Sequence, residues 1–80
     1  MTGRHSRRAA AARYERAIRA LHENSIKDYA AGVDYETPEF RELNRDVWDA
    51  EPGVSRWRQW RICRRVVREL DYWNHMGGTG

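Results

Sequence analysis

A second cysteine, a long apolar run and a glycine-rich loop motif are all missing from this 80-residue chain. Because Cys63 is the only cysteine, no internal disulfide can form, and a reducing, cytoplasmic setting is the default expectation. No stretch approaches the ~20 apolar residues that cross a bilayer, so we expect no membrane partner. A chain this short also excludes a multi-domain enzyme and a barrel with an interior site. We expect a single domain over residues 1–80.

Groups that carry catalysis or bind metals are equally scarce. The histidines His5, His22 and His75 lie far apart in the sequence and, with one cysteine, give no zinc-ligand spacing. We expect His22 to be an ordinary surface residue. Cys63 falls on the apolar face of a predicted helix, where it is expected to act as a small buried hydrophobe. The sequence therefore predicts no enzyme activity, no cofactor and no metal site.

Charge is segregated along the chain, although its formal net charge is only +3. Residues 1–27 hold seven basic groups against two acids, and residues 28–51 hold eight acids against two arginines. Residues 52–80 hold six arginines against two acids. This order either holds the folded elements together or leaves two basic surfaces for an anionic partner.

The spacing of apolar residues predicts three amphipathic helices and no strand. Gly32 ends the first helix. Thr37 and Pro38 are typical N-cap and first-turn residues for the second helix, and Ser55 caps the third. The expected helices cover residues 6–31, 38–50 and 56–75. The predicted fold is all-α, a small three-helix bundle with a long N-terminal helix, a short middle helix and a long Arg-rich C-terminal helix. A flexible basic arm at 1–5 and a flexible tail at 76–80 flank it.

The apolar positions of these helices define a thin core. Its expected members are Tyr14, Ile18, Leu21, Phe40, Leu43, Val47, Trp60, Cys63, Val67 and Leu70. A core of this size leaves an 80-residue monomer marginally stable, because small domains bury a small fraction of their surface. A homodimer or an obligate partner therefore stays an open alternative.

The third helix carries an arginine stripe over an arc of about 120°, separate from its apolar face. Trp57 and Tyr72 lie inside that arc. Guanidinium groups bind phosphate oxygens bidentately, and exposed aromatic rings stack on bases. The stripe consists of Arg58, Arg61, Arg64, Arg65 and Arg68, and Arg4, Arg7 and Arg8 of the N-terminal arm are expected to add phosphate contacts. These residues predict a small regulatory protein that binds DNA or RNA.

Two other hypotheses use the same residues. The stripe can be a solvated face, neutralised by carboxylates of the middle helix such as Asp46 and Asp49. Alternatively, the chain is an adaptor or inhibitor that docks on a host protein, of the kind that phages and plasmids encode. Its binding residues would be Trp48, Trp57, Glu42, Asp46 and Asp49, because Trp is enriched in interface hot spots. Whether the stripe faces water or these carboxylates decides between the hypotheses.

Overall fold

Four helices and one 3-10 turn make up the part of the chain that the computed structural model describes, residues 3–77 for the backbone and 6–77 for the side chains. The elements are α1 (Gly3–Ala30), α2 (Pro38–Ala50), η1 (Glu51–Gly53), α3 (Arg56–Glu69) and α4 (Tyr72–His75). No strand occurs between residues 3 and 77, and three of the helices are long. The predicted all-α fold class is confirmed.

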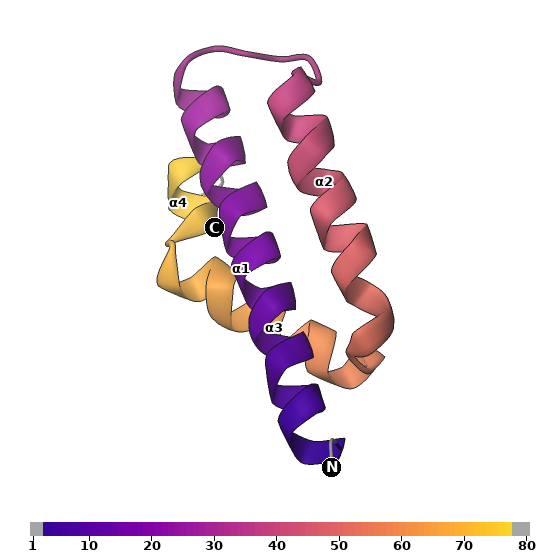
Figure 1. Cartoon of the computed structure of the whole chain (residues 1–80). Helices are drawn as coiled ribbons and strands as arrows, with labels where there is room; N and C mark the ends of the chain where they lie inside the picture. Colours follow the sequence, from indigo (N-terminus) through magenta and orange to yellow (C-terminus); the bar gives the residue numbers. More distant parts are fainter. Residues whose placement is uncertain (1–2, 78–80) are drawn as a thin grey trace.

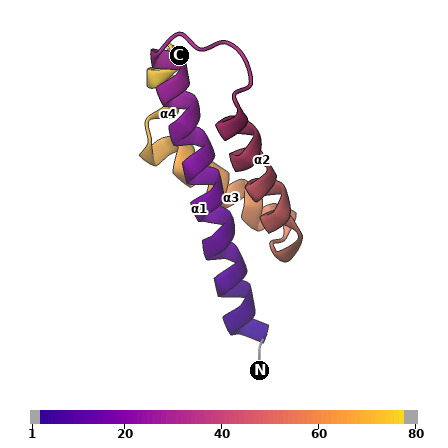
Figure 2. The same ribbon diagram turned by 45° about the horizontal axis from the view of Figure 1, so that its top comes forward.

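Helix α1 is the element on which the others pack. α2 runs antiparallel beside it, α3 crosses behind it, and α4 returns to its C-terminal half (Figure 1). A second view shows the same arrangement and shows the first turns of α1 extending past the other helices (Figure 2). α2 and α3 make few contacts with each other. The arginine-rich α3 therefore packs on α1 and not on the acidic α2.

The helix ends follow the predicted capping signals. Thr37 is extended and its Oγ1 accepts a hydrogen bond from the N–H of Phe40 at 3.0 Å, which opens α2. The Oγ of Ser55 accepts from the N–H of Arg58 at 3.2 Å and opens α3. Gly32 has a φ of +77°, a left-handed conformation that suits glycine after a helix. Helix α1 is continuous, as predicted, but it runs from Gly3 to Ala30, so residues 3–5 of the predicted flexible arm are helical.

The prediction of one helix over residues 56–75 is wrong. α3 ends at Glu69, and Asp71 adopts a left-handed conformation with φ of 54° before α4 begins. Aspartate tolerates this region better than most residues with a Cβ. The Asn74 side chain donates to both carboxylate oxygens of Asp71, at 3.1 and 2.9 Å, and stabilises the break.

The break places Tyr72 against α1, and this corrects the expectation for His22. The two rings meet edge to face with centroids 4.8 Å apart. The Nδ1 of His22 lies 3.0 Å from the carbonyl oxygen of Ile18 one turn earlier. His22 is therefore a half-buried packing residue and not an ordinary surface residue.

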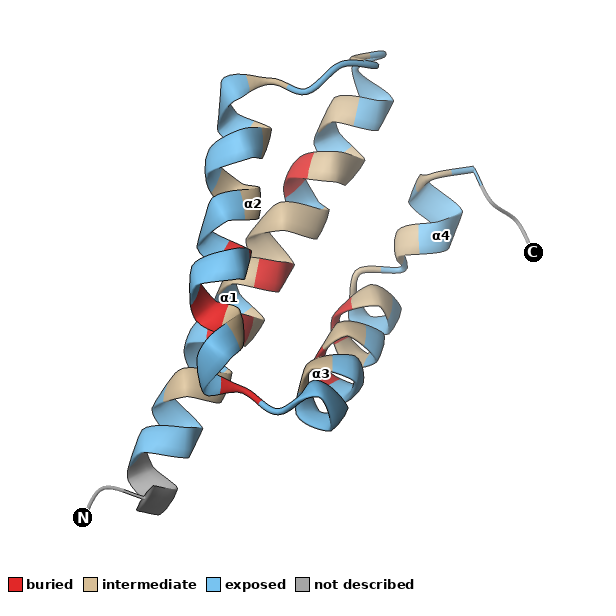
Figure 3. Cartoon of the chain, turned by 90° about the vertical axis from the view of Figure 1, so that its right-hand side faces the viewer, coloured by how far each residue is buried: buried red, intermediate tan, exposed pale blue. Residues whose placement is uncertain are grey.

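The buried residues lie where α1, α2 and α3 face one another (Figure 3). The buried apolar residues are Tyr14, Ile18, Val47, Ala50, Val54, Ile62 and Val66, with Leu21, Cys63 and Leu70 half-buried against them. Trp60 was expected here, but its exposed fraction is 49%. Phe40, Leu43 and Val67 are only half-buried. α3 is rotated so that Ile62 and Val66, and not Trp60, occupy the centre of its buried face.

Val66 provides a test of this rotation, because its exposed fraction is 0% while the adjacent Val67 is half-buried. We expect Val66→Ala to lower the free energy of unfolding by about 2–3 kcal/mol, from lost burial and the cavity left behind. Val67→Ala is the matched control and should cost less than half as much. Urea denaturation followed by circular dichroism measures both. Equal losses would contradict the rotation described here.

Tyr14 joins α1 to α3 by a polar contact inside the core. Its hydroxyl is hydrogen-bonded to the Sγ of Cys63 at 3.5 Å. Burial raises the pKa of Tyr14 well above its ordinary value, and the hydrogen bond with Cys63 raises this pKa further. The neutral phenol is therefore the form that the folded protein holds.

This pKa shift predicts a loss of stability in alkali. A folded-state pKa above the unfolded one contributes stability that is fully present below about pH 10 and is lost as the pH rises further. We expect the free energy of unfolding to fall above that pH. The fall should be shallower in Tyr14→Phe, which has no phenol to ionise. Urea titrations at several alkaline pH values measure both slopes, and parallel slopes would refute the assignment to Tyr14.

Candidate nucleic-acid interface

The arginines of α3 face solvent, and the carboxylates of α2 do not neutralise them. α3 contains six arginines and one carboxylate, Glu69. Arg58, Arg61, Arg64 and Arg68 are exposed, and none of them has an ion-pair partner among the side chains of residues 6–77. Asp46 and Asp49, the expected partners, are also free of ion pairs within that range. The charge of the stripe is therefore available to a ligand.

Arg65 is the exception, and its partner lies on α1. The Glu15 carboxylate accepts from Arg65, and from Arg19 at 3.2 Å. Arg19 also donates to Glu69 of α3 at 2.5 Å. This hydrogen bond lowers the pKa of Glu69 and raises the pKa of Arg19. The four charges form a chain, in which Glu15 and Arg19 have two partners each, and it joins α3 to α1 at two points.

The stripe and the first turns of α1 enclose a groove. Its walls come from α1 on one side and α3 on the other, and its volume is about 370 Å³. It is lined by Arg8, Ala11, Ala12, Glu15, Arg58, Arg61, Ile62 and Arg65. Arg58 also lines a neighbouring hollow of about 410 Å³, together with Arg7 and residues 52–55. We call these two depressions, which share Arg58, the basic groove.

Local structure positions the two walls of the basic groove. The Gln59 side chain donates to the carbonyl oxygens of Glu51 and Val54, at 3.2 and 2.8 Å, and so holds the start of α3 on the preceding turn. A Cβ at Gly53 would lie only 3.0 Å from the Cβ of Ala10, which shows how closely this turn approaches α1. Small residues at both positions bring the arginines of α1 and α3 within reach of one ligand.

The structure therefore gathers most of the predicted binding residues and separates a few. Arg7, Arg8, Arg58, Arg61 and Arg65 line the basic groove. Trp57, Arg64 and Arg68 are exposed elsewhere on α3. The Arg4 side chain lies outside the described residues. Tyr72 was expected at the end of the stripe, but its ring packs against His22 instead.

Sequence reasoning missed Trp60 as an exposed residue. Its ring stacks on that of Trp57, with centroids 5.1 Å apart and planes at 24°. The guanidinium carbon of Arg64 lies 5.1 Å from the centre of the Trp60 ring. A signal was present in the sequence, because Trp60 falls at the edge of the apolar arc, one turn before Arg64.

The residues of the adaptor hypothesis do not form one surface. Trp48 is 63% exposed, and helix geometry places it with Asn44 and Arg45. Glu42, Asp46 and Asp49 recur at intervals of four and three residues and share a different face of α2. The acidic and aromatic parts of that predicted site are therefore separated, and docking on a host protein stays an untested hypothesis.

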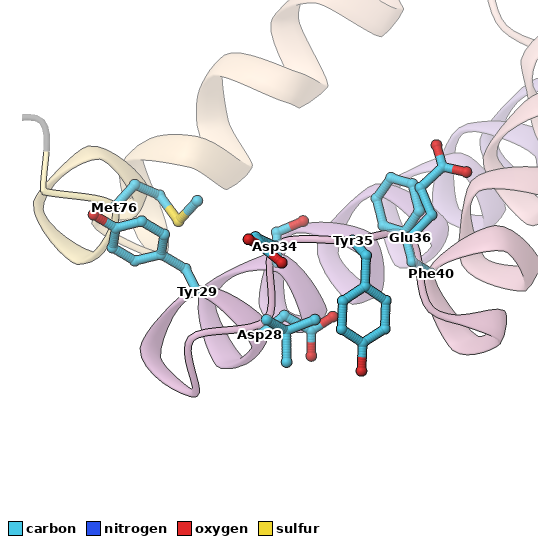
Figure 4. A pocket seen from close by; sticks show the side chains of 9 residues that line it. Asp28, Tyr29, Asp34, Tyr35, Glu36, Phe40 and Met76 are labelled. Carbon is cyan, nitrogen blue, oxygen red and sulfur yellow. The ribbon is translucent and has the colours of Figure 1, made fainter.

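A second pocket lies at the other end of α1 and has the opposite charge. Its volume is about 260 Å³, and acidic and aromatic side chains line it. The lining residues are Ser25, Asp28, Tyr29, Val33, Asp34, Tyr35, Glu36, Phe40 and Met76. Tyr29 lies beside Met76, while Tyr35 and Glu36 point away from them (Figure 4). The rings diverge and form no enclosed cage. The carboxylates of Asp28, Asp34 and Glu36 would repel a phosphate at this end of the molecule.

No group of three or more His, Cys, Asp or Glu side chains among the described residues could hold a metal ion. Of the helices between residues 3 and 77, none combines the length and the apolar character that a membrane span needs. The basic groove is thus the main feature that needs a functional explanation.

The chain matches no protein-family model, no curated protein and no solved structure. No relative therefore assigns a role to the arginines of the basic groove. What the groove binds has to follow from its charge, its shape and its residues.

Proposed function

We propose that the protein binds nucleic acid by holding phosphate groups in the basic groove. One observation carries the proposal. Arginines from the first turns of α1 and from α3, far apart in the sequence, line one groove in which Glu15 is the single carboxylate. Like charges gathered in this way repel each other unless an anion is present, so a structural role does not explain them.

The spacing of the arginines suits a phosphate backbone. Arg58, Arg61 and Arg65 follow one line of α3 and span about 10 Å of helix axis, along which one strand of a duplex presents about three phosphates. Guanidinium groups bind such oxygens bidentately and are more weakly hydrated than lysine ammonium groups. Arg7 and Arg8 extend the same positive surface onto α1. The groove therefore offers phosphate contacts on two sides of a strand.

Removing arginines from the groove should weaken binding through the loss of phosphate contacts. We expect the double variant Arg58→Ala/Arg61→Ala to bind nucleic acid about tenfold or more weakly. The slope of log affinity against log salt should fall by about two, because each lost phosphate contact lowers it by about one. Fluorescence anisotropy with labelled oligonucleotides at several salt concentrations measures both quantities.

The matched control is Arg41→Ala/Arg45→Ala, which removes the same charge from α2. Arg41 lies outside the basic groove, and its Nε is 3.6 Å from the Oε1 of Glu36. We expect a smaller loss of affinity and an unchanged salt slope for this variant. Equal effects of the two double variants would show non-specific charge attraction and would refute the groove. Absence of binding to any nucleic acid at low salt would refute the proposed function.

Glu15 competes with a phosphate for Arg65, and this competition predicts a gain of affinity. We expect Glu15→Gln to bind nucleic acid more tightly and with a salt slope steeper by about one, because Arg65 becomes free for a phosphate. Glu69→Gln changes the net charge equally, but Glu69 pairs with Arg19 and lies outside the groove. It should change the salt slope little. The same anisotropy titrations measure both variants, and identical slopes would contradict a role for Arg65.

A further inference from the structure

Two tryptophans at the start of α3 have no role in the core. The exposed fractions of Trp57 and Trp60 are 65% and 49%, and neither ring belongs to the buried cluster. Tryptophan carries the largest area that a protein can bury, so two adjacent exposed rings are unusual in a chain with a thin core. The packing of the core therefore does not explain why these two rings are exposed.

The two rings and one guanidinium form a row of flat groups. Trp57 and Trp60 are stacked, with centroids 5.1 Å apart and planes at 24°. The guanidinium carbon of Arg64 lies 5.1 Å from the centroid of Trp60, on the next turn of the helix. The spacing of three and four residues keeps all three on one line of α3. We call Trp57, Trp60 and Arg64 the tryptophan platform.

The charge around the platform is positive. Arg61 and Arg68 are exposed on the same helix, and Arg61 also lines the basic groove. The one carboxylate of α3, Glu69, is held by Arg19. A flat aromatic surface bordered by guanidinium groups matches a ligand that has both a flat π face and a negative charge. An unpaired nucleotide combines the two.

We infer that the ligand of the proposed interface is single-stranded nucleic acid, DNA or RNA, with a base stacked on the platform and its phosphates in the basic groove. The inference rests on the proposed function and narrows its ligand. Bases of a duplex are stacked on one another and present only their edges, whereas unpaired bases have free faces. Trp57 offers such a base the ring face turned away from Trp60.

The test compares Trp57→Ala with Trp48→Ala, whose wild-type side chains have nearly equal exposed fractions, 65% and 63%. Anisotropy titrations at low salt would use oligodeoxyuridylate and oligouridylate of about 20 nucleotides, which carry the same base and differ only in the sugar and are longer than typical single-strand sites. A mixed-sequence duplex of equal length is the third probe. We expect Trp57→Ala to weaken single-strand binding about fivefold or more, because a stacked base is lost. Duplex binding should stay nearly unchanged, and Trp48→Ala should alter neither.

Two further variants separate ring stacking from loss of structure. Trp57→Phe keeps a flat ring and should retain most of the single-strand affinity, whereas Trp57→Leu keeps apolar bulk without a flat face and should not. Circular dichroism checks that the helix content is unchanged. If Trp57→Ala loses helicity, the Phe and Leu variants carry the comparison. Equal affinities of these two would overturn the inference.

The outcomes distinguish this inference from the proposed function. If single strands and duplex bind alike, independently of Trp57 but dependent on Arg58 and Arg61, the platform is not a base-stacking site and the basic groove remains. If the wild-type protein binds none of the three probes, the proposed function fails and the inference fails with it. A difference between the two single-stranded probes would assign the ligand to DNA or to RNA.

Discussion

The crossing of α3 over α1 is the contact on which the remaining structure depends. Ile62 and Val66 enter the buried cluster with Tyr14 and Ile18, and Glu15 joins the two helices beside it by accepting from Arg65. The apolar contact supplies most of the stabilisation, because partly exposed ion pairs contribute little. The packing of Ile62 and Val66 therefore sets the register of the crossing, and the ion pairs add to it. That register places the arginines of α3 opposite those of the first turns of α1, and the basic groove is a consequence of it.

A scarcity of large buried side chains has a second consequence. The core is built from valine, isoleucine, alanine and one tyrosine, and all four tryptophans have exposed fractions of 49% or more. The backbone is correspondingly thin, extending 14 Å along its shortest principal axis. The tryptophan rings therefore lie outside the core, where Trp57 and Trp60 stack on each other and Trp60 contacts Arg64. A thin core and an aromatic surface are two results of the same packing.

Local signals explain which parts of this fold the sequence predicts. Thr37 and Ser55 cap helices through hydrogen bonds to residues three positions away, so the starts of α2 and α3 can be predicted from a few neighbouring residues. The break at Asp71 depends on Asn74 and on the fit of Tyr72 against His22, which is a tertiary contact. The rotation of α3 about its axis also depends on tertiary contacts. The helical wheel of α3 has a wide apolar arc, and the wheel alone does not show which part of that arc faces α1. Trp60 lies at the edge of the arc and for this reason was misplaced.

The candidate site likewise has one part that the sequence predicts and one part that depends on tertiary contacts. The arginine stripe is visible in one helix, but its partner is not, because Glu15 lies in the basic first segment and the acids of α2 are far more numerous. Of the acids of α2, Glu39 pairs with Lys27 at 3.7 Å, and Glu36 of the preceding loop pairs with Arg41 at 3.6 Å, and all four side chains are more than half exposed. Because α3 packs on α1, the segregation of charge along the sequence survives as segregation in space. A polyanion, the class of ligand that we propose, would be attracted to α3 and repelled by α2, so that the field of the protein would orient the encounter before any specific contact forms.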